Sequence, residues 1–164
     1  MVDISKREIG FLAGGFFVGL ILMGIMMWTM MPGMMLTVHK SKYDFETTVS
    51  MINQSSVEHG WVVPKIYNIQ ASLKEAGYED ATKIKIISLC QPDHAYKILK
   101  DDKNKKVTAI MPCRVGIYED SKGDVYVSEM NIGLMSKMFG GTIEEVMGGV
   151  AKEEHEMFKD IFAD

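Results

Sequence analysis

The hydrophobic pattern is unbroken near the start of the chain, where no charged residue occurs between Glu8 and His39. The residues between them, 9–38, read IGFLAGGFFVGLILMGIMMWTMMPGMMLTV. A helix of about 20 apolar residues crosses the hydrocarbon core of a bilayer, whereas a helix on a soluble core keeps a polar face. The pattern therefore predicts a transmembrane helix over residues 9–31, preceded by a short tail of residues 1–8.

A cleaved signal peptide is the alternative for this segment. Signal peptides have an apolar core of about 7–15 residues and end in a small-x-small cleavage site. Here the core is longer and ends in WTMMPG, which lacks such a site and places Trp28 where an interfacial aromatic residue is expected. We therefore expect an uncleaved anchor, ended by Pro32 and Gly33 in a linker of residues 32–35.

The orientation of the anchor is weakly marked by charge, because Lys6 and Arg7 before the span are balanced by Lys40 and Lys42 after it. A short tail ahead of a first helix usually stays in the cytoplasm. We expect a single-pass protein with a cytoplasmic N-terminus and its soluble domain outside.

Glycines recur at a spacing of four in the predicted span. Gly10 and Gly14 form one such pair, and Gly15 and Gly19 form another. Small residues one turn apart let two membrane helices approach closely. This spacing predicts self-association, or contact with another membrane protein, in addition to contact with lipid through residues 9–31.

Beyond the linker, residues 36–164 suit one compact domain in which strands and helices alternate. Alternation of apolar and polar residues predicts strands over 36–41, 61–63, 83–90, 107–112, 114–118 and 124–130. Apolar residues at helical spacing predict helices over 45–59 and 70–76, one beginning at Pro92, and one from Thr142 towards Phe162.

Start and stop signals support these boundaries. Asp44 suits the N-cap of the first helix, and Thr142 with Glu145 forms a capping box for the last. Pro64 is expected to break the second strand, and residues 101–106 to form a solvated charged turn. The predicted fold is a two-layer α+β domain with helices on one face of a mixed β-sheet.

The charge of the domain excludes one class of partner. Apart from four charged residues before the span, the chain carries 20 acidic and 16 basic side chains. A nucleic-acid-binding protein needs a basic face to neutralise phosphates, so we expect no nucleic-acid partner.

Two cysteines and one histidine are the candidates for chemistry. Cys90 and Cys113 each lie beside a proline at a predicted strand end, and His94 follows Cys90 by about one helical turn. Three interpretations stay open: two buried free cysteines, a disulfide or redox pair, or a site for a soft metal ion or haem iron. In the last case Met111 or Met130 is a possible fourth ligand.

Several short motifs occur in a characteristic order along the domain. They are DFExTV at 44–49, GW at 60–61, CxP at 90–92, AYK at 95–97, MPCR at 111–114, and YE at 118–119 before GxVY at 123–126. Further blocks are MNxGLM at 130–135 and FGG at 139–141. The chain resembles the domain of unknown function 302 family, in its membrane-anchored form with two cysteines. The resemblance implies a compact α+β fold with a mixed sheet and no assigned activity.

The remaining polar residues do not form a recognisable catalytic site. Ser-His-Asp nucleophile signatures and a phosphate-binding loop are missing from the sequence, and the glutamates of the last predicted helix have the pattern of a solvated face. We therefore expect a membrane-anchored, non-enzymatic binding or accessory domain. The alternative is a thiol-redox or soft-metal protein that uses Cys90 and Cys113 with copper or haem iron.

Overall fold

A computed structural model describes residues 6–163, so residues 1–5 of the predicted tail lie outside the described part of the chain. The chain divides into two compact units, Met1–Met34 and Met35–Asp164. Each unit has its own organisation and is treated separately.

The first unit is dominated by the long helix α1, Lys6–Met35. Within the described residues, its segment Gly14–Met35 is long and apolar enough to cross a membrane, with a mean hydropathy of 1.8 and 0% of its most apolar stretch buried. The predicted stop at Pro32 is wrong, because the helix continues to Met35. Proline removes one hydrogen bond of a helix and adds a local clash, but the methionines before Pro32 and after Gly33 favour helix.

The second unit is an α+β domain, which confirms the predicted fold class. Within residues 35–163 its strands form one sheet in the order β1-β5-β4-β3-β2, and each ladder between neighbouring strands is antiparallel. The expected mixed sheet is therefore wrong, because β2, β3, β4 and β5 follow one another in the chain as adjacent strands of alternating direction, and β1 pairs antiparallel with β5 at the edge. The strands are β1 Leu36–Lys40, β2 Val62–Asn68, β3 Ile84–Cys90, β4 Cys113–Glu119 and β5 Val125–Met130.

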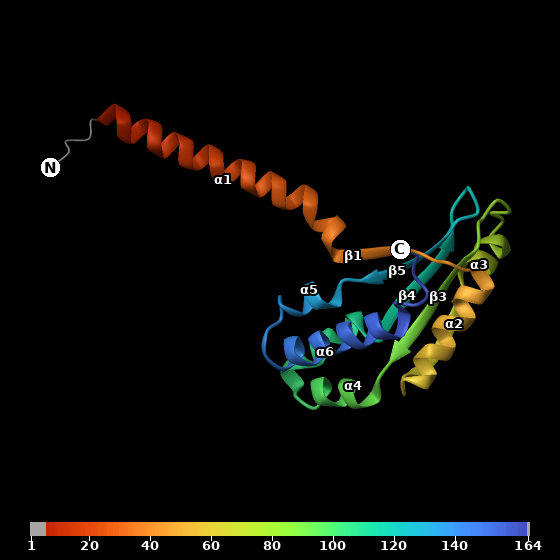
Figure 1. Ribbon diagram of the computed structural model, residues 1–164. Helices are drawn as coiled ribbons and strands as arrows, with labels where there is room; N and C mark the ends of the chain where they lie inside the picture. Colours follow the sequence, from red (N-terminus) through yellow and green to blue (C-terminus); the bar gives the residue numbers. More distant parts are fainter. Residues whose placement is uncertain (1–5, 164) are drawn as a thin grey trace. The chain divides into compact units, whose positions relative to one another are not determined.

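Helices cover one face of this sheet, and α2 and α6 lie across it in Figure 1. The core between the two layers is apolar, with Ile52 of α2, Phe158 of α6 and Val115, Ile117 and Val127 of the sheet almost fully buried. The helices are α2 Phe45–Glu58, α3 Ile69–Glu75, α4 Pro92–Leu99, the 3-10 helix η1 Asp102–Ile110, α5 Ile132–Ser136 and α6 Gly141–Phe158.

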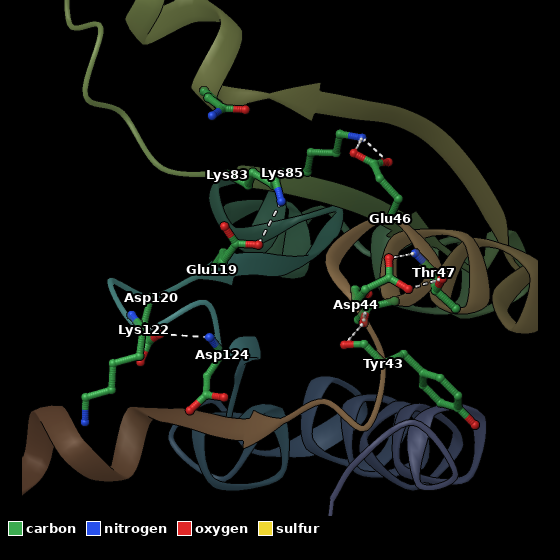
Figure 2. A network of polar contacts seen from close by, with 12 residues as sticks. Tyr43, Asp44, Glu46, Thr47, Lys83, Lys85, Glu119, Asp120, Lys122 and Asp124 are labelled. Atoms are coloured by element: carbon green, nitrogen blue, oxygen red, sulfur yellow. Dashed lines mark hydrogen bonds and ion pairs between the residues drawn. The ribbon is translucent and has the colours of Figure 1, made fainter.

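Local signals in the sequence fix several element ends. Asp44 caps α2 as predicted, with its carboxylate accepting a hydrogen bond from the Thr47 backbone N–H at 3.1 Å (Figure 2). Gly60 takes a φ of 79° after α2, a conformation that suits glycine. In the β4–β5 turn, the Asp120 carboxylate accepts backbone hydrogen bonds from Lys122 and Asp124, both at 2.9 Å.

Ion pairs join neighbouring elements on the same side of the domain. Lys85 of β3 contacts Glu46 of α2 at 2.7 Å, and Lys83 contacts Glu119 of β4 at 2.9 Å (Figure 2). These pairs are at least partly exposed, so each adds little to stability.

Three local predictions in the domain are wrong. β2 passes through Pro64 with a register shift between Val62 and Lys65, because a proline is tolerated at a bulge of an edge strand. Residues 107–110, expected to begin a strand after a charged turn, continue the 3-10 helix η1. The predicted capping box is also absent from the described residues, since α6 begins at Gly141 and its N-cap is Gly140, without a side-chain cap.

Candidate functional site

Two pockets lie on either side of α6, and the first contains the cysteines. This cysteine pocket, with a cavity volume of about 20 Å³, lies where the end of β3 and the start of β4 meet α4 and α6. Its wall is mainly apolar. It is lined by Trp61, Leu89, Cys90, Gln91, His94, Ala95, Ile98, Met111, Pro112, Cys113, Met147 and Val150.

His94 is held in the cysteine pocket by a residue of α6. Its Nε2 atom lies 2.9 Å from Oε1 of Glu153, whose Oε2 accepts a hydrogen bond from Trp61 Nε1 at 3.2 Å. His94 Nδ1 is buried and has no hydrogen-bond partner among residues 6–163. Glu153 therefore fixes the positions of both rings by bridging α6 to α4 and to the start of β2.

Of the three interpretations of the cysteines, the disulfide is wrong. Within the described residues both cysteines are free, and the sheet register places Cys113 opposite Leu89, whereas Cys90 is opposite Val62 on the other side of β3. The two cysteines line one pocket but do not face each other as a cross-strand pair. The alternative of a soft-metal or haem-iron site at Cys90, Cys113 and His94 has no support either, because no three histidine, cysteine, aspartate or glutamate side chains within residues 6–163 are grouped so as to hold a metal ion.

The methionines considered as a fourth ligand are also separated. Met111 lines the cysteine pocket, whereas Met130 lines the pocket on the other side of α6.

The environment of Cys113 keeps its thiol protonated. The side chain is buried and hydrogen-bonded to the Glu154 carboxyl of α6. Burial, together with the nearby charges of Glu154 and Cys90, raises the thiol pKa far above its usual range. Since the thiolate is the nucleophile and the metal ligand, this environment disfavours both kinds of chemistry at Cys113.

The second pocket is larger and more polar. This carboxyl pocket, with a cavity volume of about 160 Å³, lies between β1, β5, α6 and the segment that follows α6. It is lined by Thr37, His39, Glu129, Met130, Asn131, Ile132, Gly133, Ala151, Glu154, His155 and Phe162.

One buried glutamate, Glu154, and one partly buried glutamate, Glu129, give the carboxyl pocket its chemistry. Burial raises the pKa of Glu129 to about 7. Burial, and secondarily the charge of Glu129, raises the pKa of Glu154 to about 8. Glu154 is only 6% exposed, and Oε1 of Glu129 is buried without a hydrogen-bond partner among the residues described. Both carboxyls therefore retain protons near neutral pH.

Part of the wall of the carboxyl pocket is built by the segment that follows α6. Phe162 stacks on His39 of β1, with ring centroids 4.2 Å apart. Backbone hydrogen bonds hold this segment against β1, from Lys42 N–H to Ile161 at 3.0 Å and from Ala163 N–H to Lys40 at 2.8 Å. The aromatic wall is therefore fixed to the same sheet that carries Glu129.

The interpretation of the α6 glutamates as one solvated face is wrong for Glu154. The spacing in the sequence distinguishes Glu154 from the exposed glutamates of α6, because it lies four residues after Val150 and three before Met157, on the apolar stripe. Glu129 likewise continues the alternation of Val125 and Val127, whose side chains are buried under the helices.

The glycines of α1 are open to contact. A Cβ added at Gly10, Gly14, Gly15 or Gly19 would have nothing within 4 Å, apart from the helix itself, among the residues described. Association through this face stays a prediction.

Comparison with known proteins agrees with the fold. The family described as "Domain of unknown function DUF302" matches residues 37–164. A similar solved structure is the crystal structure of an uncharacterized conserved protein DUF302 from Bacillus stearothermophilus, with a TM-score of 0.69 and 18% sequence identity. That match covers 78% of this chain and 98% of the other. At this identity it supports the fold alone, and no curated protein matches the chain.

Proposed function

The chain belongs to the family of domain of unknown function DUF302, and we propose that it is a membrane-anchored binding domain that takes a small ligand into its carboxyl pocket. The family assigns no activity, so the proposal rests on the geometry of this chain.

The apolar helix supports membrane anchoring. Its segment Gly14–Met35 has the length and hydropathy of a membrane span. We propose a single-pass anchor with the N-terminus in the cytoplasm and the domain outside.

The observation that carries the binding role is the buried, unpartnered Oε1 atom of Glu129 in an open pocket. Buried polar atoms in proteins nearly always have a partner, and an exception calls for an explanation such as a water, an ion or a functional role. Pockets that combine apolar walls with a few convergent polar groups and perturbed pKa values are typical ligand sites.

A binding role explains the site better than thiol chemistry does. Cys113 is hydrogen-bonded to Glu154 and its raised pKa keeps it protonated, so it is a poor nucleophile. The same Glu154 also lines the carboxyl pocket, together with Glu129.

The test uses the full chain in detergent micelles and three probes of similar size and different charge: propylamine, propan-1-ol and propionate. If the pocket binds ligands, at least one probe shifts the NMR signal of the Ala151 methyl group in a saturable way. Gly133→Leu should abolish this shift, because a side chain added at Gly133 points towards Ala151, with its Cβ 3.6 Å from the methyl carbon.

Gly148→Leu is the matched control, since it changes a helical glycine that does not line the pocket and has nothing within 4 Å of its added Cβ among the residues described. If none of the three probes shifts the Ala151 signal, the carboxyl pocket is not a binding site and the proposed function is wrong.

A further inference from the structure

We infer that the ligand of the carboxyl pocket is a small organic cation with a primary ammonium group, and that its binding releases protons from the pocket. This inference rests on the proposed function and specifies the chemical class of its ligand.

The charges around the pocket favour a cation. The titratable groups that face it are His39 from β1, Glu129 from β5, and Glu154 and His155 from α6. Cys113 of β4 reaches Glu154 from the other side as a protonated thiol. Among the residues described, no lysine or arginine lines the pocket, so no permanent positive charge balances the two carboxyls.

The hydrogen-bonding groups also call for a donor. Oε1 of Glu129 has no donor within residues 6–163, and an ionised carboxylate accepts hydrogen bonds but donates none. The Asn131 side-chain oxygen is already used, because it accepts a hydrogen bond from the Leu134 backbone N–H at 3.1 Å. An ammonium group brings three N–H donors and a positive charge to two carboxyls whose burial makes ionisation costly.

An ammonium group fits the site better than a metal ion or an anion. Within the described residues no group of three or more histidine, cysteine, aspartate or glutamate side chains is arranged to hold a metal ion. An anion would lie beside Glu129 and Glu154, where ionisation of either carboxyl repels it. The stacked rings of His39 and Phe162 offer an apolar wall for the carbon part of the ligand.

Proton release follows from the protonation of the empty pocket. A primary amine has a pKa near that of lysine, about 10.4, so it enters as the ammonium ion at pH 7. Its charge favours the ionised form of Glu129 and Glu154, whose pKa values of about 7 and about 8 leave them partly protonated. The ligand keeps its three N–H protons, and the carboxyl proton passes to the buffer.

The experiment is isothermal titration calorimetry of the full chain in detergent at pH 7, with propylamine, propan-1-ol and propionate as probes. Propylamine should bind roughly tenfold or more tightly than either analogue, because a hydrogen bond to a charged group contributes about 1.5–3 kcal/mol. Phosphate and HEPES differ in ionisation enthalpy, so a proton released on binding makes the measured heat depend on the buffer. The difference between the two heats should correspond to the release of about one proton per propylamine bound.

The variants Glu129→Gln and Glu154→Gln should each weaken propylamine binding roughly tenfold or more and reduce the proton release. Glu156→Gln is the control, because Glu156 is on the same helix and exposed, and it does not line the pocket. Circular dichroism shows whether each variant is folded. The affinities of the three probes are compared on the unaltered chain, so that part of the test does not depend on the folding of any variant.

Two results overturn the inference. If propan-1-ol or propionate binds as tightly as propylamine and shifts the Ala151 signal, the pocket binds ligands but is not a cation site. If propylamine binds without proton release, or if both glutamine variants bind it as tightly as the unaltered chain does, the two carboxyls are not its partners. Absence of binding by all three probes contradicts the proposed function itself.

Discussion

The imidazole of His94 and the carboxylate of Glu153 lie 2.9 Å apart, between Nε2 and Oε1, and join α4 to α6. The other oxygen of Glu153 accepts a hydrogen bond from Trp61, which is 3% exposed. One partly exposed glutamate thus connects three segments that are far apart in the sequence.

We expect Glu153→Ala to lower the free energy of unfolding by about 1 kcal/mol, because two hydrogen bonds are lost from a partly solvated carboxylate. Denaturation followed by Trp61 fluorescence, in a Trp28→Phe background, measures this change. Glu156→Ala removes a glutamate of the same helix that is exposed and paired with Lys159, and it should have little effect. Equal losses from the two variants would contradict the bridging role of Glu153.

The pH dependence of stability should reveal the buried carboxyl of Glu154. Its pKa is raised from 4.5 to about 8 in the folded domain, so the folded state binds more protons than the unfolded state between these values. The contribution of Glu154 to the free energy of unfolding is fully present below pH 4.5 and is lost as the pH rises towards 8. Glu129, with a pKa of about 7, contributes in the same direction.

We therefore expect Glu154→Gln to flatten the fall in stability between pH 5 and pH 8 by an amount of the order of a few kcal/mol. Denaturant unfolding at a series of pH values measures the slope. Glu156→Gln should leave the slope unchanged, because the hydrogen bond from Lys159 lowers the pKa of Glu156 and moves its effect to more acidic pH. A wild-type slope that Glu154→Gln preserves would show that Glu154 does not titrate there.

The sequence predicts the elements whose ends have a local cause. Asp44 has the side chain to cap α2, and Gly60 supports the positive φ that follows it. The 3-10 helix over 102–110 and the passage of β2 through Pro64 depend on neighbouring elements, so local propensity misplaces both. The antiparallel pairing of β1 with β5 likewise joins residues far apart in the chain, and spacing alone does not fix it.

In the carboxyl pocket, too, some features follow from the local sequence and others depend on how distant elements pack. Periodicity places Glu154 on the buried stripe of α6 and Glu129 on the covered face of β5, so each burial was predictable from its own element. Their meeting was not predictable, because it depends on how α6 crosses the sheet. The cysteines illustrate the opposite error: a shared predicted strand-end position suggested a pair, but the register separates them.

The two thiols should differ in reactivity. Cys113 is 9% exposed and hydrogen-bonded to Glu154, whereas Cys90 is only partly buried at the end of β3. We expect iodoacetamide to modify Cys90 first in the native protein and Cys113 only after unfolding, as measured by mass spectrometry of peptides. In guanidinium chloride both should react. Native labelling of Cys113 at the rate of Cys90, or a Cys90–Cys113 crosslink, would contradict this environment.

Substitution within α1 tests membrane anchoring. Ile21→Arg places a charge near the middle of α1 and inside the proposed span, and an arginine at the centre of a membrane helix costs about 2.5–3.5 kcal/mol. We expect the unaltered chain to resist extraction from membranes by alkaline carbonate and the Ile21→Arg chain to be extracted more readily. Val57→Arg, at an exposed apolar residue of α2, is the control. If carbonate extracts the unaltered chain completely, α1 is not an anchor.

The glycines of α1 make a separate prediction about association. Isoleucine at Gly15 and Gly19 would prevent the close approach of two helices along this face, so the double variant should shift any oligomer towards the monomer in detergent. Gly24→Ile is the matched control, since Gly24 lies on the same helix but is five residues from Gly19, outside the four-residue spacing. Light scattering of the detergent complexes measures the mass. If the double variant has the same mass as the unaltered chain, these glycines are not in the interface. If Gly24→Ile lowers the mass as much as the double variant does, a large side chain anywhere on the helix has the same effect.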